Sequence, residues 1–281
     1  MKVLINGATG NIGSHLLKLV EQNANSAIRA VSRTTHPDTE KLEWVKVDYE
    51  NKESIKSSLE GIDKVFLIVP FQENRKQLIN DYSAALNESE VKQIVLISGG
   101  NPTSEGIEIQ RINAMMEETI KNTGIAYTFI RPSMFMQNIV NFYADSIKLQ
   151  GQFYFPFGDA ITSYVDARDI AEVAHWSFNN EEAKNQAYTL GSYSHTHNEI
   201  AKIASNVIGK EVSYIDVPAE TSADGMRQFQ MPEWNIEVMQ ELYAATKAGY
   251  LSQSTSTYED LLGKKPRTWE QFFEDNKTVL Q

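Results

Sequence analysis

Three glycines near the N-terminus separate a short apolar run from an apolar helical pattern, in the order M-K-V-L-I-N-G-A-T-G-N-I-G-S-H-L. Residues 2–5 have the composition of a buried strand, and the helical pattern begins at Ile12, inside the glycine run. Gly7 can take a tight turn that a side chain would hinder. Gly10 lets the backbone approach a pyrophosphate, and Gly13 lets the helix pack on the first strand. A glycine turn that binds nothing would leave this spacing unexplained, so G-x-x-G-x-x-G predicts a dinucleotide-binding turn.

The composition is that of a folded chain with few options for thiol or nucleic-acid chemistry. Of its 281 residues 41% are hydrophobic, which is ample for a core. The net charge of −11 argues against a nucleic-acid partner, although a local basic pocket remains compatible with it. The chain has no cysteine, which excludes disulfides, thiolate catalysis and cysteine-ligated zinc.

No stretch approaches the roughly 20 apolar residues of a membrane span, and the first residues lack the apolar segment of a signal peptide. We therefore expect a soluble, cytoplasmic protein with a small-molecule ligand and no membrane partner. The oligomeric state stays open between a monomer and a homodimer.

Strand-like and helix-like segments alternate along the first half of the chain. The expected strands are 3–6, 27–32, 44–47, 65–69, 94–98 and 127–131. The expected helices between them are 12–23, 52–60, 74–88 and 108–122. Several strands are continuous apolar runs, as in parallel sheets buried on both faces. The alternation predicts an α/β fold with a doubly wound parallel sheet, the Rossmann fold.

The pattern changes after about residue 150, where G-Q-F-Y-F-P-F-G-D is aromatic and rich in turns. We expect residues 1–150 to form the dinucleotide-binding domain and residues 151–281 a smaller α+β substrate domain, partly interleaved with it. In the second part, 162–178 is expected to be a strand and a helix, 187–190 and 212–217 strands, and 198–208 and most of 233–281 helical.

The end of the second predicted strand carries Arg33, twenty residues after Gly13. A carboxylate at this place binds the adenosine ribose of NAD. Here the sequence S-R-T-T supplies donors instead, and a guanidinium suits a 2′-phosphate. The sequence therefore predicts NADP(H) in preference to NAD(H), the alternative being a solvated loop arginine.

Two other motifs have ordinary explanations. Asp48 closes the third strand, where it could meet the adenine amino group or cap the following helix. The segment from His195 to Glu199 contains possible metal ligands, but Thr196 and Glu199 before an apolar helix are better explained as a capping box, so no metal site is predicted.

A Tyr-x-x-x-Lys pair at Tyr243 and Lys247 matches the proton-donating pair of short-chain dehydrogenases. In that chemistry the pair lies on the helix after the fifth strand, which here is 108–122 and contains no tyrosine. We interpret the match at 243–247 as chance on a helix surface.

Four segments together resemble the NmrA-like, atypical branch of the short-chain dehydrogenase/reductase family, and within it the bacterial NAD(P)H:quinone reductase-like members. They are N-G-A-T-G-N-I-G at 6–13, Ser98-Gly99-Gly100, G-I-A-Y-T-F-I-R-P-S-M-F-M-Q-N at 124–138 and Y-V-D-A-R-D-I-A-E-V-A at 164–174. The resemblance covers nearly the whole chain and implies an NADP(H)-binding fold with a small substrate domain.

The resemblance also implies which residues surround the ligands. Those expected to bind the cofactor are Gly7, Thr9, Gly10, Asn11, Ile12, Gly13, Arg33, Asp48, Pro70, Phe71, Ser98, Gly99 and Pro132. Those expected to line the substrate pocket are Met134, Phe135, Gln137, Asn138 and Tyr164. Further aromatic and methionine side chains, Met136, Phe153, Tyr154 and Phe155, either add to an apolar lining or pack in the core.

The chain departs from the family pattern at two positions. Many relatives carry His or Lys where this chain has Asn113, and sometimes Lys where it has Glu118. An amide cannot act as a general acid at neutral pH. Asn113 is thus a weak catalytic candidate, suited to positioning an acceptor or a water.

Three functions are compatible with these features. The first is an NADPH-dependent oxidoreductase that transfers hydride to a small apolar acceptor such as a quinone, which needs little acid assistance. The second is a non-enzymatic redox sensor that binds NAD(P). The third is a nucleotide-sugar epimerase-like enzyme, which shares the glycine spacing but needs the missing tyrosine–lysine pair.

Overall fold

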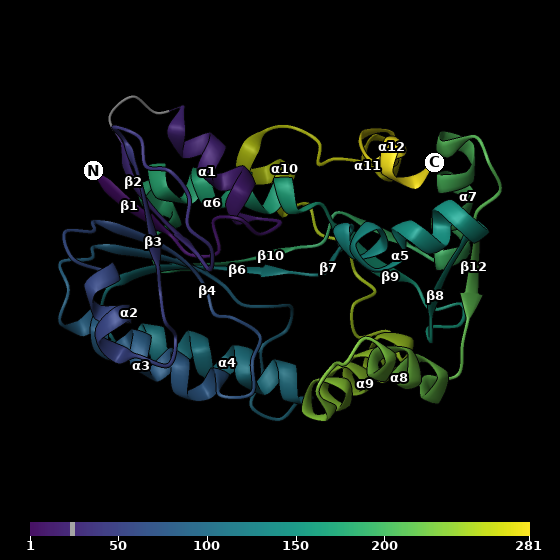
Figure 1. Ribbon diagram of the computed structural model, residues 1–281, viewed down its shortest axis with the longest axis horizontal. Helices are drawn as coiled ribbons and strands as arrows, with labels where there is room; N and C mark the ends of the chain where they lie inside the picture. The colour runs from purple at the N-terminus through teal and green to yellow at the C-terminus, as the bar shows by residue number, and fades with distance from the viewer. Residues whose placement is uncertain (23–25) are drawn as a thin grey trace. The chain divides into compact units, whose positions relative to one another are not determined.

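The computed structural model describes residues 1–22 and 26–281 (Figure 1). Its contacts divide the chain into two compact units. The first unit consists of residues 1–106, 110–131 and 167–189, and the second of residues 107–109, 132–166 and 190–281. The chain therefore passes between the units several times.

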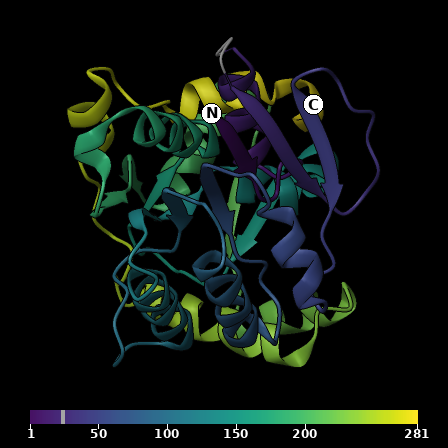
Figure 2. The same cartoon turned by 90° about the vertical axis from the view of Figure 1, so that its left-hand side faces the viewer.

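A seven-stranded sheet in the order β10-β6-β5-β4-β1-β2-β3 forms the first unit. The pairs from β6 to β3 are parallel, and Figure 2 shows the purple and blue strands β1, β2 and β3 side by side. The strands are β1 Lys2–Ile5, β2 Ala27–Ser32, β3 Leu42–Lys46, β4 Lys64–Ile68, β5 Gln93–Ile97, β6 Ala126–Pro132 and β10 Gln186–Leu190. Each predicted strand of the first half is confirmed, with ends within two residues of the expectation.

Helices cover both faces of this sheet. They are α1 Gly13–Glu21, α2 Lys52–Ser58, α3 Arg75–Asn87, α4 Glu108–Lys121 and α6 Ala167–Asn179, with a 3₁₀ turn η1 at Glu181–Ala183. Figure 1 shows α2, α3 and α4 on one face and α1 and α6 on the other. The predicted doubly wound α/β fold is confirmed. The predicted helix 12–23 corresponds to α1, and its last residue, Asn23, lies outside the described residues.

The apolar runs explain why the strands lie inside. Every residue of β5 is buried, and so are Val65, Phe66 and Leu67 of β4. The central core of the first unit joins these strands to the apolar faces of α3 and α4, through Leu78 and Met116 among others. Parallel strands covered on both faces need such continuous apolar sequences.

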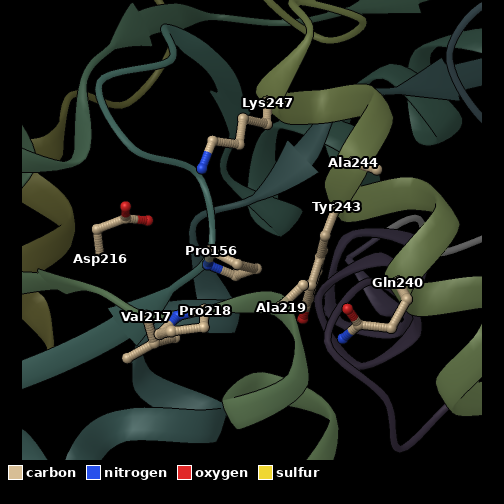
Figure 3. Close-up of a pocket in the computed structure, with 9 residues that line it drawn as sticks. All are labelled: Pro156, Asp216, Val217, Pro218, Ala219, Gln240, Tyr243, Ala244 and Lys247. Atoms are coloured by element: carbon tan, nitrogen blue, oxygen red, sulfur yellow. The ribbon is translucent and has the colours of Figure 1, made fainter.

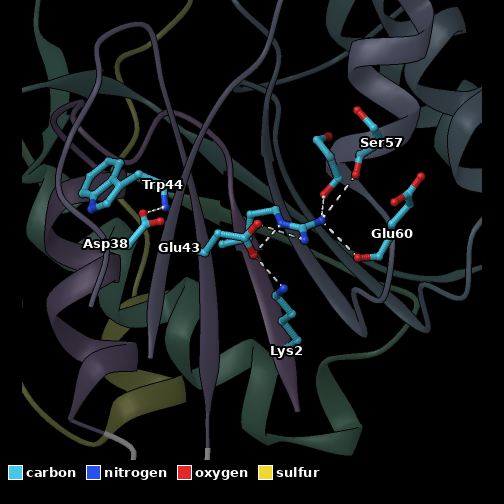
Figure 4. Close-up of polar contacts among 8 residues, drawn as sticks. Lys2, Asp38, Glu43, Trp44, Ser57 and Glu60 are labelled. Carbon is cyan, nitrogen blue, oxygen red and sulfur yellow. Dashed lines mark hydrogen bonds and ion pairs between the residues drawn. The ribbon is translucent and has the colours of Figure 1, made fainter. Parts of the chain in front are cut away.

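Arg29 on β2 hydrogen-bonds both to Glu43 on the edge strand β3 and to the end of α2, in the region that Figure 4 shows. The carboxylate of Glu43 accepts from Arg29 Nε at 3.1 Å and from Lys2 Nζ at 2.7 Å, so it links β3 to both β2 and β1. Arg29 also donates to the carbonyl oxygens of Ser58 at 2.8 Å and Glu60 at 3.0 Å, at the end of α2, where a cation is favourable. The hydrogen bond from Lys2, reinforced by Arg29, lowers the pKa of Glu43 despite its partial burial.

The second unit contains two small sheets, in the orders β11-β9-β7 and β12-β8. Its strands are β7 Met134–Phe135, β8 Gln152–Phe155, β9 Thr162–Val165, β11 Tyr193–His195 and β12 Ser213–Asp216. Its helices are α5 Gln137–Gln150, α7 His197–Ile208, α8 Ala219–Gln228, α9 Glu233–Lys247, α10 Thr257–Leu262, α11 Trp269–Asp275 and α12 Lys277–Leu280. An aromatic core that includes Phe153, Phe155 and Trp269 holds these short elements together.

The capping box that the sequence predicts is present at the start of α7. Thr196 Oγ1 accepts from the N–H of Glu199 at 3.2 Å, and the Glu199 carboxylate accepts from the N–H of Thr196 at 2.8 Å. Helix α5 was not predicted from the sequence, and its start carries no side-chain cap from Met136. None of the helices in the described ranges is long and apolar enough to span a membrane.

Candidate functional site

The glycine turn joins β1 to α1 with the geometry expected of its glycines. Gly7 has a φ of +67°, in the left-handed region, and its carbonyl accepts from the N–H of Gly10 at 2.9 Å. A Cβ at Gly13 would lie 2.2 Å from the carbonyl oxygen of Gly7. The helix can therefore begin this close to the turn only because residue 13 has no side chain.

The outer side of this turn is open to solvent. Thr9, Gly10 and Asn11 are exposed, whereas Ile12 is buried beneath them. Within the described chain no side chain caps the N-terminus of α1, and its first turn carries no acidic residue. An exposed, uncapped helix start beside a glycine turn fits a pyrophosphate group.

A polar cluster lies at the end of β2. Ser32 Oγ, Thr34 Oγ1 and His36 Nε2 form a triangle with sides of 3.0 to 3.2 Å. The guanidinium of Arg33 is exposed next to this triangle in sequence, and no hydrogen bond or ion pair engages it among the residues described. The structure thus leaves Arg33 available for a ligand.

His36 was not singled out from the sequence, although it follows Arg33 in the same loop. Its ring lies 4.2 Å from the ring of Trp44 on β3, measured between centroids, and its Nε2 reaches back to Ser32. The histidine in S-R-T-T-H was the available signal, but only the contact with β3 places its ring among the hydroxyl groups.

Asp48 does not cap the following helix, so that alternative is wrong. The cap of α2 is Asn51, whose side chain accepts from the N–H of Glu53 at 3.0 Å. Asp48 instead accepts from the N–H of Glu50 at 3.0 Å and is exposed. The tight turn that starts at Asp48 makes Asn51 the residue adjoining the helix.

A buried polar network supports the end of β1. Asn6 Nδ2 donates to Tyr82 Oη on α3 at 2.5 Å, and Tyr49 Oη donates to Asn6 Oδ1 at 3.3 Å. Burial raises the pKa of Tyr49 and raises that of Tyr82 well above its ordinary value, so both phenols stay protonated. These bonds hold the residue that precedes the glycine turn.

Glu117 joins three elements at the same edge of the sheet. Its buried carboxylate on α4 accepts from Ser98 Oγ at 2.7 Å, just past β5, and from Arg131 Nε at 2.8 Å and Nη2 at 2.5 Å on β6. The hydrogen bond with Glu117 raises the pKa of Arg131. Ser98, one of the residues expected to bind the cofactor, is thus held in place by a buried carboxylate.

Asn113 lies on the buried side of α4, with 4% of its surface exposed. A Cβ at Gly99 would lie 2.4 Å from Asn113 Nδ2, so the amide packs directly on that glycine. Asn113 Oδ1 is buried and has no hydrogen-bond partner within the described residues. A buried carbonyl oxygen of this kind can accept a hydrogen bond from a ligand.

Pro70 and Phe71 follow β4 at the carboxyl edge, and Phe71 is 38% exposed. The guanidinium carbon of Arg75, at the start of α3, lies 5.4 Å from the centroid of the Phe71 ring. Arg75 is a second residue that was not identified from the sequence. A single arginine on a helix is expected to be solvated, and only the structure shows that this one is buried.

The expected substrate-pocket residues and Pro132 belong to the second unit. Pro132 and Met134 are buried, and Phe135, Gln137 and Asn138 are partly exposed. Gln137 Nε2 donates to Asp166 at 2.9 Å. Tyr164 is fully buried, with its hydroxyl 2.8 Å from His197 Nε2. Of the further aromatic and methionine candidates, Met136, Phe153 and Phe155 pack in the core of this unit.

Tyr243 and Lys247 line a pocket of about 370 Å³ within the second unit (Figure 3). Its other lining residues are Pro156, Asp216, Val217, Pro218, Ala219, Gln240 and Ala244. Burial raises the pKa of Tyr243 to about 12. A catalytic phenol in a tyrosine–lysine pair needs a lowered pKa, so this pair does not have the electrostatics of a proton donor.

The fold and the glycine turn define a protein of the Rossmann-fold, NAD(P)-binding class. Residues 1–273 match the model of the NmrA-like family, and the chain belongs to that family. The resemblance deduced from the four sequence segments is confirmed.

Several characterised or solved relatives align with nearly the whole chain. An NAD(P)H azoreductase from Xenophilus azovorans is 29% identical over 275 residues, which are 96% of each chain. A nucleoside-diphosphate-sugar epimerase structure from Staphylococcus aureus has a TM-score of 0.86 at 24% identity and covers 98% of this chain and 100% of its own. An NADPH-dependent quinone oxidoreductase from Escherichia coli, solved with NADPH, has a TM-score of 0.85 at 19% identity and covers 98% of this chain and 99% of its own. At these identities the two structures establish a shared fold.

Proposed function

We propose that this protein is an NADPH-dependent oxidoreductase that transfers hydride to a small, easily reduced acceptor such as a quinone. The observation that carries the cofactor assignment is at the end of β2. There Arg33 makes no hydrogen bond or ion pair with any described residue, and it adjoins in sequence the Ser32, Thr34 and His36 triangle. A guanidinium with neighbouring hydroxyl groups complements a 2′-phosphate and lacks the carboxylate that favours NAD. The descriptions of the azoreductase and quinone oxidoreductase relatives support the reaction class.

Different residues would bind the two halves of the cofactor. The exposed backbone of Gly10 and Asn11 and the start of α1 suit the pyrophosphate. Asn113 Oδ1 and the Ser98 hydroxyl, both at the carboxyl edge, suit the nicotinamide half. The bound cofactor would supply a hydride, that is, one proton together with two electrons.

This residue set favours an acceptor that needs no strong general acid. Asn113 cannot donate a proton at neutral pH, and Glu117 is committed to Arg131 and Ser98. A quinone accepts the hydride first and takes its second hydrogen as a proton from water. An unactivated carbonyl would need proton delivery during transfer.

A titration with NADPH and NADH, followed by a panel of quinones, flavins and simple aldehydes, tests the proposal. We expect tighter NADPH binding and oxidation of NADPH by quinones but not by aldehydes. Equal affinity for the two cofactors would contradict the cofactor assignment. Tight binding without turnover of any acceptor would favour the second candidate, a redox sensor, which the amide at Asn113 also suits.

A further inference from the structure

Arg75 is an arginine buried in the first unit without a compensating charge. Only 8% of its surface is exposed, and it lies on the same face of α3 as Leu78, Ile79 and Tyr82. Its Nε is buried and has no hydrogen-bond partner among the described residues, and none of their carboxylates pairs with the guanidinium. Burial alone lowers the pKa of Arg75 to about 10, which is still far above neutral pH, so the group remains a cation.

Such a group destabilises a protein unless something binds it. Removing a charge from water is unfavourable, and buried ions are usually paired or hydrogen-bonded. The contact with the Phe71 ring at 5.4 Å recovers part of this cost. The buried Nε, which no described residue engages, indicates that a ligand supplies an anion for Arg75.

The position of Arg75 indicates where that anion would lie. Tyr82 contacts Asn6 at the end of β1, and Arg75 is seven residues earlier, about 10 Å along the helix axis. Because α3 begins after β4, its N-terminus lies beyond the carboxyl ends of the strands, where ligands of this fold bind. The first turn of α3 has no acidic residue and no side-chain cap from Asn74, which adds to the positive potential.

The sheet order separates Arg75 from the expected 2′-phosphate site. β4 lies on one side of β1, whereas β2, which ends at Ser32 and Arg33, lies on the other side. Arg75 and the exposed Phe71 are therefore on the side where the nicotinamide and the acceptor are expected. The Phe71 ring beside the Arg75 guanidinium would complement an aromatic ligand that carries an acidic group.

We propose that Arg75 binds an acidic group of the electron acceptor, with the acceptor ring against Phe71. The preferred substrates would then be aromatic acceptors that carry a sulfonate or carboxylate. The kinetic test of this inference rests on the proposed reductase function. The cofactor pyrophosphate is the other source of an anion near this edge, and the experiment separates the two.

The kinetic test compares NADPH-dependent reduction of menadione, which is neutral, with 1,2-naphthoquinone-4-sulfonate, in the native chain, Arg75→Met and Arg75→Lys. Loss of a charge-assisted hydrogen bond should raise the KM of Arg75→Met for the sulfonate about tenfold, with kcat and the menadione KM nearly unchanged. Arg75→Lys should recover part of the sulfonate KM. The neighbouring exposed residue supplies the control Lys76→Met, which should match the native chain.

The Kd for NADPH and the unfolding temperature distinguish an acceptor site from a cofactor site and from a structural role of Arg75. The Kd for NADPH should be the same in the native chain and Arg75→Met, and a weaker Kd with an unchanged sulfonate KM would overturn the acceptor assignment in favour of the pyrophosphate. Arg75→Met should also unfold at a higher temperature without ligand, because an uncompensated charge is removed. A lower unfolding temperature, or equal sulfonate KM values, would overturn the proposal.

Calorimetry with 2-naphthalenesulfonate and NADP⁺-loaded protein needs no turnover. Tight binding to the native chain and weak binding to Arg75→Met would support the anion site even if no quinone were reduced, in which case only the proposed reductase function would fail. No difference in sulfonate binding between the two proteins would contradict the anion site directly.

Discussion

The side chain of Asn113 lies so close to Gly99 that a Cβ at the glycine would be 2.4 Å from Asn113 Nδ2. The contact joins α4 to the loop after β5, at the carboxyl edge of the sheet. It leaves Asn113 Oδ1 buried and without a partner among the residues described. The absence of a side chain at Gly99 is therefore what allows the Asn113 amide of α4 to pack against the loop after β5.

Gly99→Ala should act by displacing the Asn113 amide. If Oδ1 accepts a hydrogen bond from the bound cofactor, Asn113→Ala should weaken NADPH binding about fivefold to tenfold, the effect of one hydrogen bond. Gly99→Ala should weaken it similarly, and the double variant should be no worse than either single one. Additive effects in a calorimetric titration would show that the two residues act separately.

Arg33→Ala should reduce the preference for NADPH over NADH about tenfold, because it removes a charge-assisted hydrogen bond to the 2′-phosphate. His36→Ala should reduce the preference less, because its ring organises Ser32 and Thr34. Dissociation constants for both cofactors provide the measurement. Lys46→Ala, an exposed cation on the adjacent strand β3, is the matched control, and an equal effect there would indicate a general loss of positive charge.

Gly13→Ala and Gly10→Ala should separate folding from binding. At Gly13 the new Cβ would lie 2.2 Å from Gly7 O and 2.7 Å from Gly7 C, which are backbone atoms that cannot yield easily. Overpacking of this kind costs about 1–3 kcal/mol, so Gly13→Ala should lower the free energy of unfolding. At Gly10 the nearest atom is Gly7 O at 3.2 Å and the residue is exposed, so the fold should survive while NADPH binding weakens. Normal binding by a folded Gly10→Ala protein would place the phosphates elsewhere.

His197 should make the second unit sensitive to acid. Burial lowers its pKa to about 3, whereas the unfolded chain should have a value near 6.5. Above about pH 6.5 the ring is neutral in both states, and below it only the unfolded state gains the proton, so stability falls as the pH falls. The contribution of His197 should decrease by about 2 kcal/mol between about pH 6.5 and pH 5.

Urea unfolding at several pH values, with His197→Gln as the comparison, measures this contribution. Glutamine has no titratable ring and retains a polar group for the Tyr164 hydroxyl, which lies 2.8 Å from His197 Nε2. The stability of the variant should depend less steeply on pH. Parallel slopes for the two proteins would mean that His197 takes up its proton over the same pH range in the folded and unfolded states.

Tyr243→Phe and Lys247→Ala should leave reductase turnover within about threefold of the native rate. The pKa of Tyr243 is raised to about 12 by burial, so its phenol is a poorer acid than an ordinary tyrosine. Steady-state rates with saturating NADPH and a quinone provide the measurement. A collapse of kcat in either variant, with cofactor binding intact, would assign catalysis to the pocket in Figure 3.

Local sequence signals were sufficient for most of the architecture. The glycine spacing at Gly7, Gly10 and Gly13 predicted the turn, because a positive φ and a close helix start depend on the absence of a side chain at those positions. Continuous apolar runs predicted the parallel strands, and the Thr196–Glu199 pair predicted the start of α7. These signals act over a few residues, so one sequence contains all the information they need.

The polar arrangement around the site was decided by the tertiary structure. Glu117 meets Arg131 and Ser98, and Tyr82 meets Asn6, only after separate strands and helices have packed. Arg75 is the clearest case of a residue that the sequence could not identify. Its sequence neighbours are polar, and it became a candidate binding residue only because the fold buries it without a counter-charge. The sequence by itself determined where most of the strands, turns and helices form, with α5 among the exceptions. The tertiary structure determined which charged side chains are buried and which are paired, because burial and pairing depend on residues far apart in the chain.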